Sequence, residues 1–393
     1  MEMPLAGIRV LDLSTMYPGP VCTMTLADFG AEVIRVDPTK GGDLWRYSLP
    51  LVNGLGMPYL QVNRNKKSIC LNLKDPEAKE IFYRLVKDAD VVVEQYRPGV
   101  AQRLGVDYDT LRKLNEKIVY CSISGFGQIG PYRLLAGHDI NYISYAGILG
   151  LTARKGECPV LPGVQIGDVS GGALYAVIGI LMALMGVKQT GKGQYIDTAM
   201  FDGAVSMMHW NASSCLAGGE AMQPQGNILI GQLACYNVYE TKDGRYISLG
   251  AVEAHLWGNF CEKIGHPEFT DSQRKVEKQH DMIAFLRTLF RSKTLEEWKQ
   301  FLADTDCCWS PVATVDEVMN DPQVMARGMI TEMTDPKGEY GTVKFIASPL
   351  KLSETPARNE LFPPRKGEHT REVLRSCGYS EEEIDKFYAD GAV

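Results

Sequence analysis

The sequence predicts an α/β protein, with a Rossmann-like large domain and a smaller α+β domain. Over roughly the first third of the chain, short apolar runs alternate with helix-like segments, and this alternation is typical of a parallel sheet. Near residue 231 the pattern changes to a hairpin followed by helices. A chain of 393 residues is long enough to bury the separate cores of two domains.

The N-terminal residues carry the clearest strand–helix–strand pattern. Residues 8–13 form a short apolar run typical of a buried strand, and Pro-Gly-Pro at 18–20 follows it. A proline can open a helix at its first turn, so we expect a helix over 21–29, ended by Gly30. Residues 32–37 predict the next strand. This succession is a βαβ unit, in which the two strands run parallel.

The same alternation continues along the large domain. We expect strands at 69–73, 91–94, 118–122 and 194–197, helices at 75–87 and 108–114, a long helix from Asp168 to about 187, and another helix from 201. The apolar run at 173–187 is shorter than the roughly 20 residues of a bilayer span. We therefore interpret it as a buried core helix and expect no membrane partner.

The remaining boundaries follow from composition. We expect a large domain over 1–210, a linker at 211–230, a small domain over 231–330, and a C-terminal segment at 331–393 that returns to the large domain. Within the small domain, Lys-Asp-Gly at 242–244 predicts the turn of a hairpin. Helices are expected at 256–264, 281–290, 295–302, 315–320 and after Ser380, and the hairpin strands at 235–240 and 246–249.

Charge and cysteine content exclude several classes of function. The net charge of −7 argues against nonspecific nucleic-acid binding, because nucleic-acid binding proteins carry a basic face. The ten cysteines and six histidines show no metal-ligand spacing, so no metal and no required cofactor are expected. No signal-peptide pattern precedes the first predicted strand, and we therefore expect a cytoplasmic protein with reduced thiols.

Three segments supply candidate acid–base residues. The stretch GHDINY at 137–142 joins His138, Asp139 and Tyr142, and it follows a glycine-rich run. Asp168 precedes the long apolar helix, and Glu253 follows a predicted strand. Taken one by one, the histidine could be a core residue, Asp168 a helix cap, and Glu253 a surface carboxylate. Together they predict one pocket for proton transfer.

The glycine-rich run GFGQIG at 125–130 has the spacing of a dinucleotide-binding motif and follows a strand. Pro131 comes directly after it, and no acidic residue ends a second strand at the expected distance. We therefore interpret Gly125 and Gly127 as parts of a flexible loop that contacts the ligand, rather than as an NAD site.

Several cations recur at the ends of predicted strands or in the adjacent loops, which is where open α/β sheets bind ligands. Solvated surface charge is the alternative interpretation. Because polyphosphates are held by clustered cations, we expect an anionic ligand there. The candidate contacts are Arg35, Arg64, Lys66, Lys67, Asn72 and Arg97.

The chain resembles the class III coenzyme A-transferase superfamily, also called the CaiB/BaiF family, over nearly its whole length. The matching stretches are LAGIRVLDLS at 5–14, PGP at 18–20, LADFGAEVIRV at 26–36, SGFGQ at 124–128, TGKGQ at 190–194 and GEHT at 367–370. The family binds acyl-CoA as substrate, so the resemblance assigns the cationic residues to coenzyme A. It also implies a homodimer of two interlocked rings.

Within the superfamily the chain is most similar to the α-methylacyl-CoA racemases. GHDINY at 137–142 resembles their histidine motif, and GAVE at 250–253 resembles the segment whose glutamate partners that histidine. Asp168 matches both the acid–base aspartate of the racemases and the covalent nucleophile of the transferases. Gly167 is common in transferases, whereas racemases often carry alanine at that position. The resemblance thus leaves racemisation and CoA transfer as alternatives.

The racemase alternative gives each group a role. His138, oriented by Glu253, serves one face of the α-carbon, and Asp168 serves the other. The N–H of Asp139 holds the enolate oxygen at a helix start, and Tyr142 hydrogen-bonds Asp168. On the family's architecture Glu253 comes from the partner chain. The transferase alternative needs only Asp168, as a nucleophile.

Overall fold

The computed structural model describes residues 2–393, which form two compact units. The first unit contains the residues up to Ala146, Gly163–Met207 and Gln323–Val393, and the second contains Gly147–Pro162 and Met208–Pro322. The units divide the chain differently from the expected bounds of 1–210 and 231–330. Residues 147–162 and 208–230 join the second unit.

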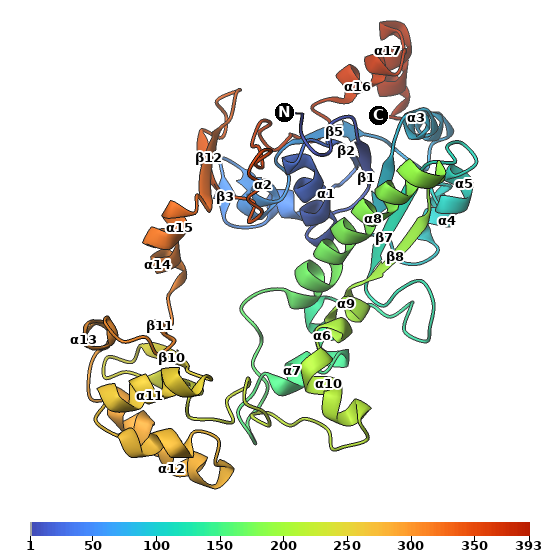
Figure 1. The fold of residues 1–393 in the computed structure, drawn as a ribbon. Coiled ribbons are helices and arrows are strands. Elements are labelled where there is room, and N and C mark those ends of the chain that lie inside the picture. The colour runs from blue at the N-terminus through green and yellow to red at the C-terminus, as the bar shows by residue number, and fades with distance from the viewer. Residues whose placement is uncertain (1) are drawn as a thin grey trace. The chain divides into compact units, whose positions relative to one another are not determined.

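The first unit is built on a six-stranded parallel sheet in the order β5-β2-β1-β6-β7-β8 (Figure 1). Its strands are β1 (Arg9–Asp12), β2 (Glu32–Asp37), β5 (Lys66–Cys70), β6 (Val91–Glu94), β7 (Val119–Ser124) and β8 (Tyr195–Ala199). This is the doubly wound arrangement, and the expectation of an α/β fold with a parallel sheet is confirmed. The chain reverses its direction across the sheet between β1 and β6, and ligands bind outside the carboxyl ends of strands at such a point.

Side chains alternate between two cores because successive strand residues face opposite sides of a sheet. Val10 and Val91 pack with helices α1 (Pro18–Asp28) and α8 (Leu174–Thr190). Leu11 and Val92 pack on the other face with α3 (Pro76–Lys87), α16 (Thr370–Ser376) and α17 (Glu381–Asp390). Both faces are therefore covered, as all-parallel sheets require.

The C-terminal segment is fixed to the first unit by hydrogen bonds. The Arg46 guanidinium donates to the Pro364 carbonyl oxygen at 3.1 Å, and the Asn72 N–H donates to the Ala392 carbonyl oxygen at 2.8 Å. The other elements of this unit are η1 (Leu44–Tyr47), β3 (Leu51–Val52), β4 (Leu55–Gly56), α2 (Met57–Gln61), α4 (Val100–Leu104), α5 (Tyr108–Leu111), α6 (Asp139–Tyr145), η2 (Ile166–Ala173), α9 (Met200–Ser206), β12 (Ile330–Thr334) and β13 (Thr342–Ile346). Helix α15 (Pro322–Ala326) begins at the boundary between the units.

Helices η2 and α8 form one continuous helix, which is buried on one side. By length and composition, Ile166–Thr190 could cross a membrane, although core helices of soluble proteins meet the same criteria. Ala176 and Ile180 are fully buried in the core, whereas Met182 and Met185 are 68% and 64% exposed. The interpretation as a buried core helix therefore holds for one face.

The second unit contains the antiparallel sheet β11-β10-β9. Its elements are β9 (Tyr236–Glu240), β10 (Tyr246–Gly250), β11 (Trp309–Pro311), α7 (Ile148–Leu151), α10 (His209–Leu216), α11 (Ala254–Lys263), η3 (Pro267–Ser272), α12 (Val276–Phe290), α13 (Leu295–Leu302) and α14 (Val315–Met319). Trp257, Phe260, Phe290 and Trp298 form the centre of its core. Helix α10 forms where the sequence predicted the beginning of a linker.

Candidate active site

The switch point between β1 and β6 brings two loops to the wall of one cavity. Residues 16–18, which follow β1, and residues 95–98, which follow β6, line a cavity of about 430 Å³. The segment 123–126, at the end of β7, contributes a third part of the wall. All residues that line this cavity belong to the first unit. We call it the switch-point cavity.

His138 lies in the wall of the switch-point cavity with its side chain exposed. It precedes the first turn of α6, and its backbone N–H donates to Oδ1 of Asn141 at 3.0 Å. Backbone N–H groups at the start of a helix have no partner within the helix, and here the Asn141 side chain accepts one of them. This bond fixes the backbone of His138, which carries the imidazole. The imidazole is thereby held at the cavity on a defined backbone.

Asp168 lines the same cavity from η2 and is half-buried. Its backbone N–H donates to Oδ1 of Asp139 at 3.0 Å. Burial, and to a smaller extent the negative charge of Asp139, raise the pKa of Asp168 to about 6, although His138 opposes the rise. A carboxyl group with a pKa near neutrality is suited to exchange protons. Asp139 itself is not among the residues that line the cavity.

Tyr142 does not make the expected hydrogen bond to Asp168. Its hydroxyl donates instead to the carbonyl oxygen of Gly137 at 2.6 Å. Burial and the charge of Asp168 raise the pKa of this phenol to about 12. A Cβ at Gly125 would lie 2.6 Å from the ring, so glycine is needed there for the close approach of Tyr142. Gly125 lines the cavity.

Gly127 shapes the glycine-rich loop instead of lining the switch-point cavity. Its φ of +82° lies in the region that favours glycine, and its N–H donates to Oγ of Ser124 at 3.1 Å. This hydrogen bond joins the loop to the last residue of β7. The structure thus brings Gly125, but not Gly127, to the cavity wall.

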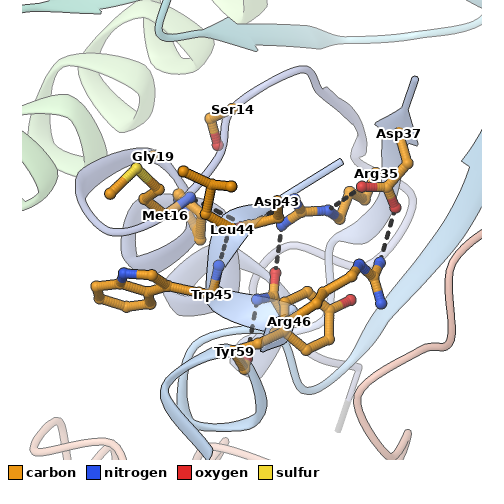
Figure 2. Close-up of polar contacts among 12 residues, drawn as sticks. Ser14, Met16, Gly19, Arg35, Asp37, Asp43, Leu44, Trp45, Arg46 and Tyr59 are labelled. Carbon is orange, nitrogen blue, oxygen red and sulfur yellow. Dashed lines mark hydrogen bonds and ion pairs between the residues drawn. The ribbon is translucent and has the colours of Figure 1, made fainter. Parts of the chain in front are cut away.

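Three of the predicted phosphate contacts have their charges buried in ion pairs within the fold. Arg35 and Arg64 are 1% exposed and Lys66 is fully buried. Arg35 bonds Asp37 and Asp43 (Figure 2), Arg64 bonds Asp28, and Lys66 bonds Asp12. Burial lowers the pKa of Lys66 to about 8. Carboxylates, rather than a ligand, satisfy these cations.

Lys67 is the second residue of β5, whereas the switch-point cavity lies beyond the carboxyl ends of β1 and β6. The sequence predicted a strand over 69–73, but β5 begins at Lys66, which pairs with Val33 near the start of β2. The Lys67 ammonium consequently bonds Glu32, the first residue of β2, and Glu372. The structure thus places Lys67 away from the carboxyl ends of the strands, where the phosphate contact was predicted.

The other two predicted contacts line cavities beside the carboxyl ends of the sheet strands. Arg97 is exposed and lines the switch-point cavity. Asn72 lines a second cavity of about 620 Å³, together with Lys40 and Lys74, which the sequence interpretation missed. Tyr96 lines both cavities. Lys40 and Lys74 each lie shortly after a strand of the sheet, and this position was the available signal.

Glu253 belongs to the second unit and is not among the residues that line the switch-point cavity. It is exposed and directly precedes the first turn of α11. Tyr17 and Trp45, which sequence reasoning did not select, do line the cavity, and their rings lie 4.8 Å apart. Within residues 2–393, no group of three His, Cys, Asp or Glu side chains could hold a metal ion.

Comparison with known proteins agrees with this geometry. The family model CoA-transferase family III matches residues 5–370. The chain is 36% identical to an alpha-methylacyl-CoA racemase of Homo sapiens, over 99% of this chain and 97% of that protein. It is 33% identical to an acyl-CoA transferase of Fusarium pseudograminearum, over 99% and 88% respectively.

A solved structure gives the same result. The crystal structure of a CAIB/BAIF family protein from Brucella suis superposes with a TM-score of 0.83 at 30% identity, covering 96% of this chain and 100% of that one. The relatives include both racemases and transferases, so they identify the family and leave the individual reaction open. The expected resemblance is confirmed, and the chain belongs to CoA-transferase family III.

Proposed function

We propose that the protein racemises the α-carbon of a 2-methylacyl-CoA thioester by transferring a proton from one face of that carbon to the other. The observation that carries the proposal is that His138 and Asp168 line the same cavity. An imidazole and a carboxyl group with a pKa of about 6 can each accept and donate a proton near neutral pH.

In the proposed reaction one group removes the α-hydrogen as a proton. The electron pair of the C–H bond moves into the thioester, which becomes an enolate with its charge on the carbonyl oxygen. The opposite group then donates a proton to the other face, so the configuration inverts with no net change in atoms or electrons. Helix α6 starts at Asp139, and its first N–H groups are the proposed donors to the enolate oxygen.

The second cavity is the proposed site of the nucleotide end of coenzyme A. Lys40 and Lys74 supply positive charge there, and Tyr96 lines both this cavity and the one proposed to hold the thioester. We expect Lys74→Ala to weaken CoA binding on the order of tenfold, as the loss of a charge-assisted hydrogen bond implies. Lys67→Ala is the matched control, because this lysine pairs with Glu32 and Glu372 and lines neither cavity. Its loss should leave the affinity for CoA unchanged.

Single enantiomers in deuterated water test the racemase proposal. The wild-type protein should incorporate deuterium at the α-carbon of both enantiomers and interconvert them. With one base per face, His138→Ala should still exchange one enantiomer while losing racemisation, and Asp168→Ala should exchange the other. If the wild-type protein exchanges no α-hydrogen in any 2-methylacyl-CoA of a panel, the proposal is wrong.

CoA transfer is the alternative function, and the environment of the Asp168 carboxyl group supports it. The carboxyl group is half-buried at a cavity wall, and no side-chain hydrogen bond engages it among the described residues, so it is available as a nucleophile. In transfer, the Asp168 carboxylate would attack the thioester carbonyl, forming an aspartyl anhydride and releasing CoA thiolate. The thiolate would then attack the aspartyl carbonyl, giving an enzyme thioester and releasing the donor carboxylate. Mass spectrometry after acyl-CoA and hydroxylamine should find modified Asp168 under this alternative, and an unmodified residue would exclude it.

The assembly belongs to the same proposal. We propose a cytoplasmic homodimer in which Glu253 of one chain orients His138 of the other. Mixing His138→Ala and Glu253→Ala proteins should restore activity if each site draws residues from two chains. Absence of activity in the mixed dimer, with both homodimers folded, would place the two residues in sites formed by one chain.

A further inference from the structure

Asp43 is a fully buried carboxylate that accepts hydrogen bonds from two separate segments at once. Its Oδ2 accepts the backbone N–H of Met16 at 3.0 Å, and its Oδ1 accepts the backbone N–H of Trp45 at 2.9 Å. Met16 lies in the loop after β1, and Trp45 lies in η1. Figure 2 draws the carboxylate between these two segments.

Both segments are walls of the switch-point cavity. Met16, Tyr17 and Trp45 line it, and the rings of Tyr17 and Trp45 lie 4.8 Å apart. Met16 has a φ of +63°, a conformation that residues other than glycine adopt only where their surroundings hold them. The bond to Asp43 is therefore positioned to maintain an unfavourable backbone beside the site.

The carboxylate is itself fixed by a buried charge network. The Arg35 guanidinium donates to Asp43 at 2.8 Å, to Asp37 at 3.1 Å and to Asn63 at 2.9 Å. Arg46 donates to the second oxygen of Asp37 at 2.8 Å and stacks over the Tyr59 ring (Figure 2). Such a network leaves Asp43 one orientation, with one oxygen for each wall.

We propose that Asp43 is a positioning residue that sets the distance between the Met16 and Trp45 walls and thereby selects the acyl group of the thioester. Arg35 takes part through Asp43 and does not contact the ligand. The inference rests on the proposed use of the switch-point cavity for acyl-CoA, and it applies equally to racemisation and to CoA transfer.

The test compares Asp43→Asn with Asp37→Asn. An asparagine at 43 keeps one oxygen for Arg35 and Met16 but turns an N–H toward the N–H of Trp45, so that wall is released. Asp37 is the matched control, because it is an equally buried carboxylate of the same network that bonds Arg35, Arg46 and Ser68 and lines neither cavity. Both changes should lower thermal stability.

The readout is the ratio of the affinities for two unreactive CoA thioethers, one with a compact and one with a branched alkyl group. We expect Asp43→Asn to change this ratio on the order of tenfold, as loss of a charged hydrogen bond implies, while Asp37→Asn leaves it within twofold of the wild-type ratio. Affinity for free coenzyme A should be the same in all three proteins, because the nucleotide end lies in the second cavity.

A double variant identifies the route of the effect. In a Trp45→Ala background, Asp43→Asn should add little further change in the ratio, because the wall that it holds is already absent. Equal ratios in Asp43→Asn and the wild-type protein, or equal changes in the Asp43 and Asp37 variants, would overturn the proposal. Failure of the wild-type protein to bind either thioether would instead overturn the proposed function.

Discussion

Replacing Asp168 with asparagine should stabilise the protein while it abolishes activity. The carboxyl group has a pKa of about 6 in the native state, against about 3.9 in an unfolded chain. The native state thus binds this proton more tightly, so ionisation of Asp168 opposes folding as the pH rises from about 4 to about 6. Two pKa units correspond to about 3 kcal/mol, and solvent screening at a half-buried group reduces this to about 1–2 kcal/mol.

The sign gives the comparison a definite pH dependence. Asparagine cannot ionise, so the stability gap between the variant and the wild-type protein should be small at pH 4.5, grow up to about pH 6, and remain constant above it. Urea unfolding of both proteins at pH 4.5, 6 and 7.5 measures the gap. A variant that is equally stable or less stable at pH 7.5 would show that desolvation does not control Asp168, and the reasoning about its proton affinity would fail.

Three further changes test the surroundings of Asp168 and Tyr142 and one buried ion pair outside the site. Asp139→Asn removes the like charge beside Asp168, and the acidic limb of the pH–rate profile should move below about pH 6. Gly125→Ala should lower the free energy of unfolding by about 1–3 kcal/mol and reduce kcat, because the new Cβ would lie 2.6 Å from the Tyr142 ring and displace it. Gly150→Ala is the control and should have neither effect, because the space around its Cβ is open. Asp28→Ala should cost about 3–5 kcal/mol in urea unfolding, because it leaves a buried guanidinium unpaired.

The sheet could be predicted from the sequence because its strands are apolar and bounded by turn residues. The predicted strands at 32–37 and 91–94 match β2 and β6, and the predicted helix at 295–302 matches α13. Strand β5 was misplaced because it begins with two lysines, and a charged strand start resembles a loop. Burial of Lys66 depends on Asp12, which lies far away in the sequence, so no local pattern reports it.

Sequence analysis selected candidate site residues that lie together in one short motif. It missed residues such as Trp45, whose place at the cavity depends on contacts with distant parts of the chain. His138, Asp139 and Tyr142 lie within one motif, and the structure places this motif at the cavity or directly beside it. Trp45 was missed although its bond to Asp43 is local, because Asp43 also bonds Met16, which lies 27 residues earlier. No local pattern around Trp45 reports that second bond.

The cations at the sheet illustrate a general criterion. Arg35 is paired with Asp37, which ends the same strand β2, and Lys66 is paired with Asp12, which ends β1; both cations are buried in these pairs. Arg97, in contrast, follows β6 in an exposed loop and lines the switch-point cavity. A cation is free for an anionic ligand only if no carboxylate of the fold lies within reach. The acidic residues at strand ends therefore decide which basic residues bind ligand, and they should be counted first when such a site is inferred from sequence.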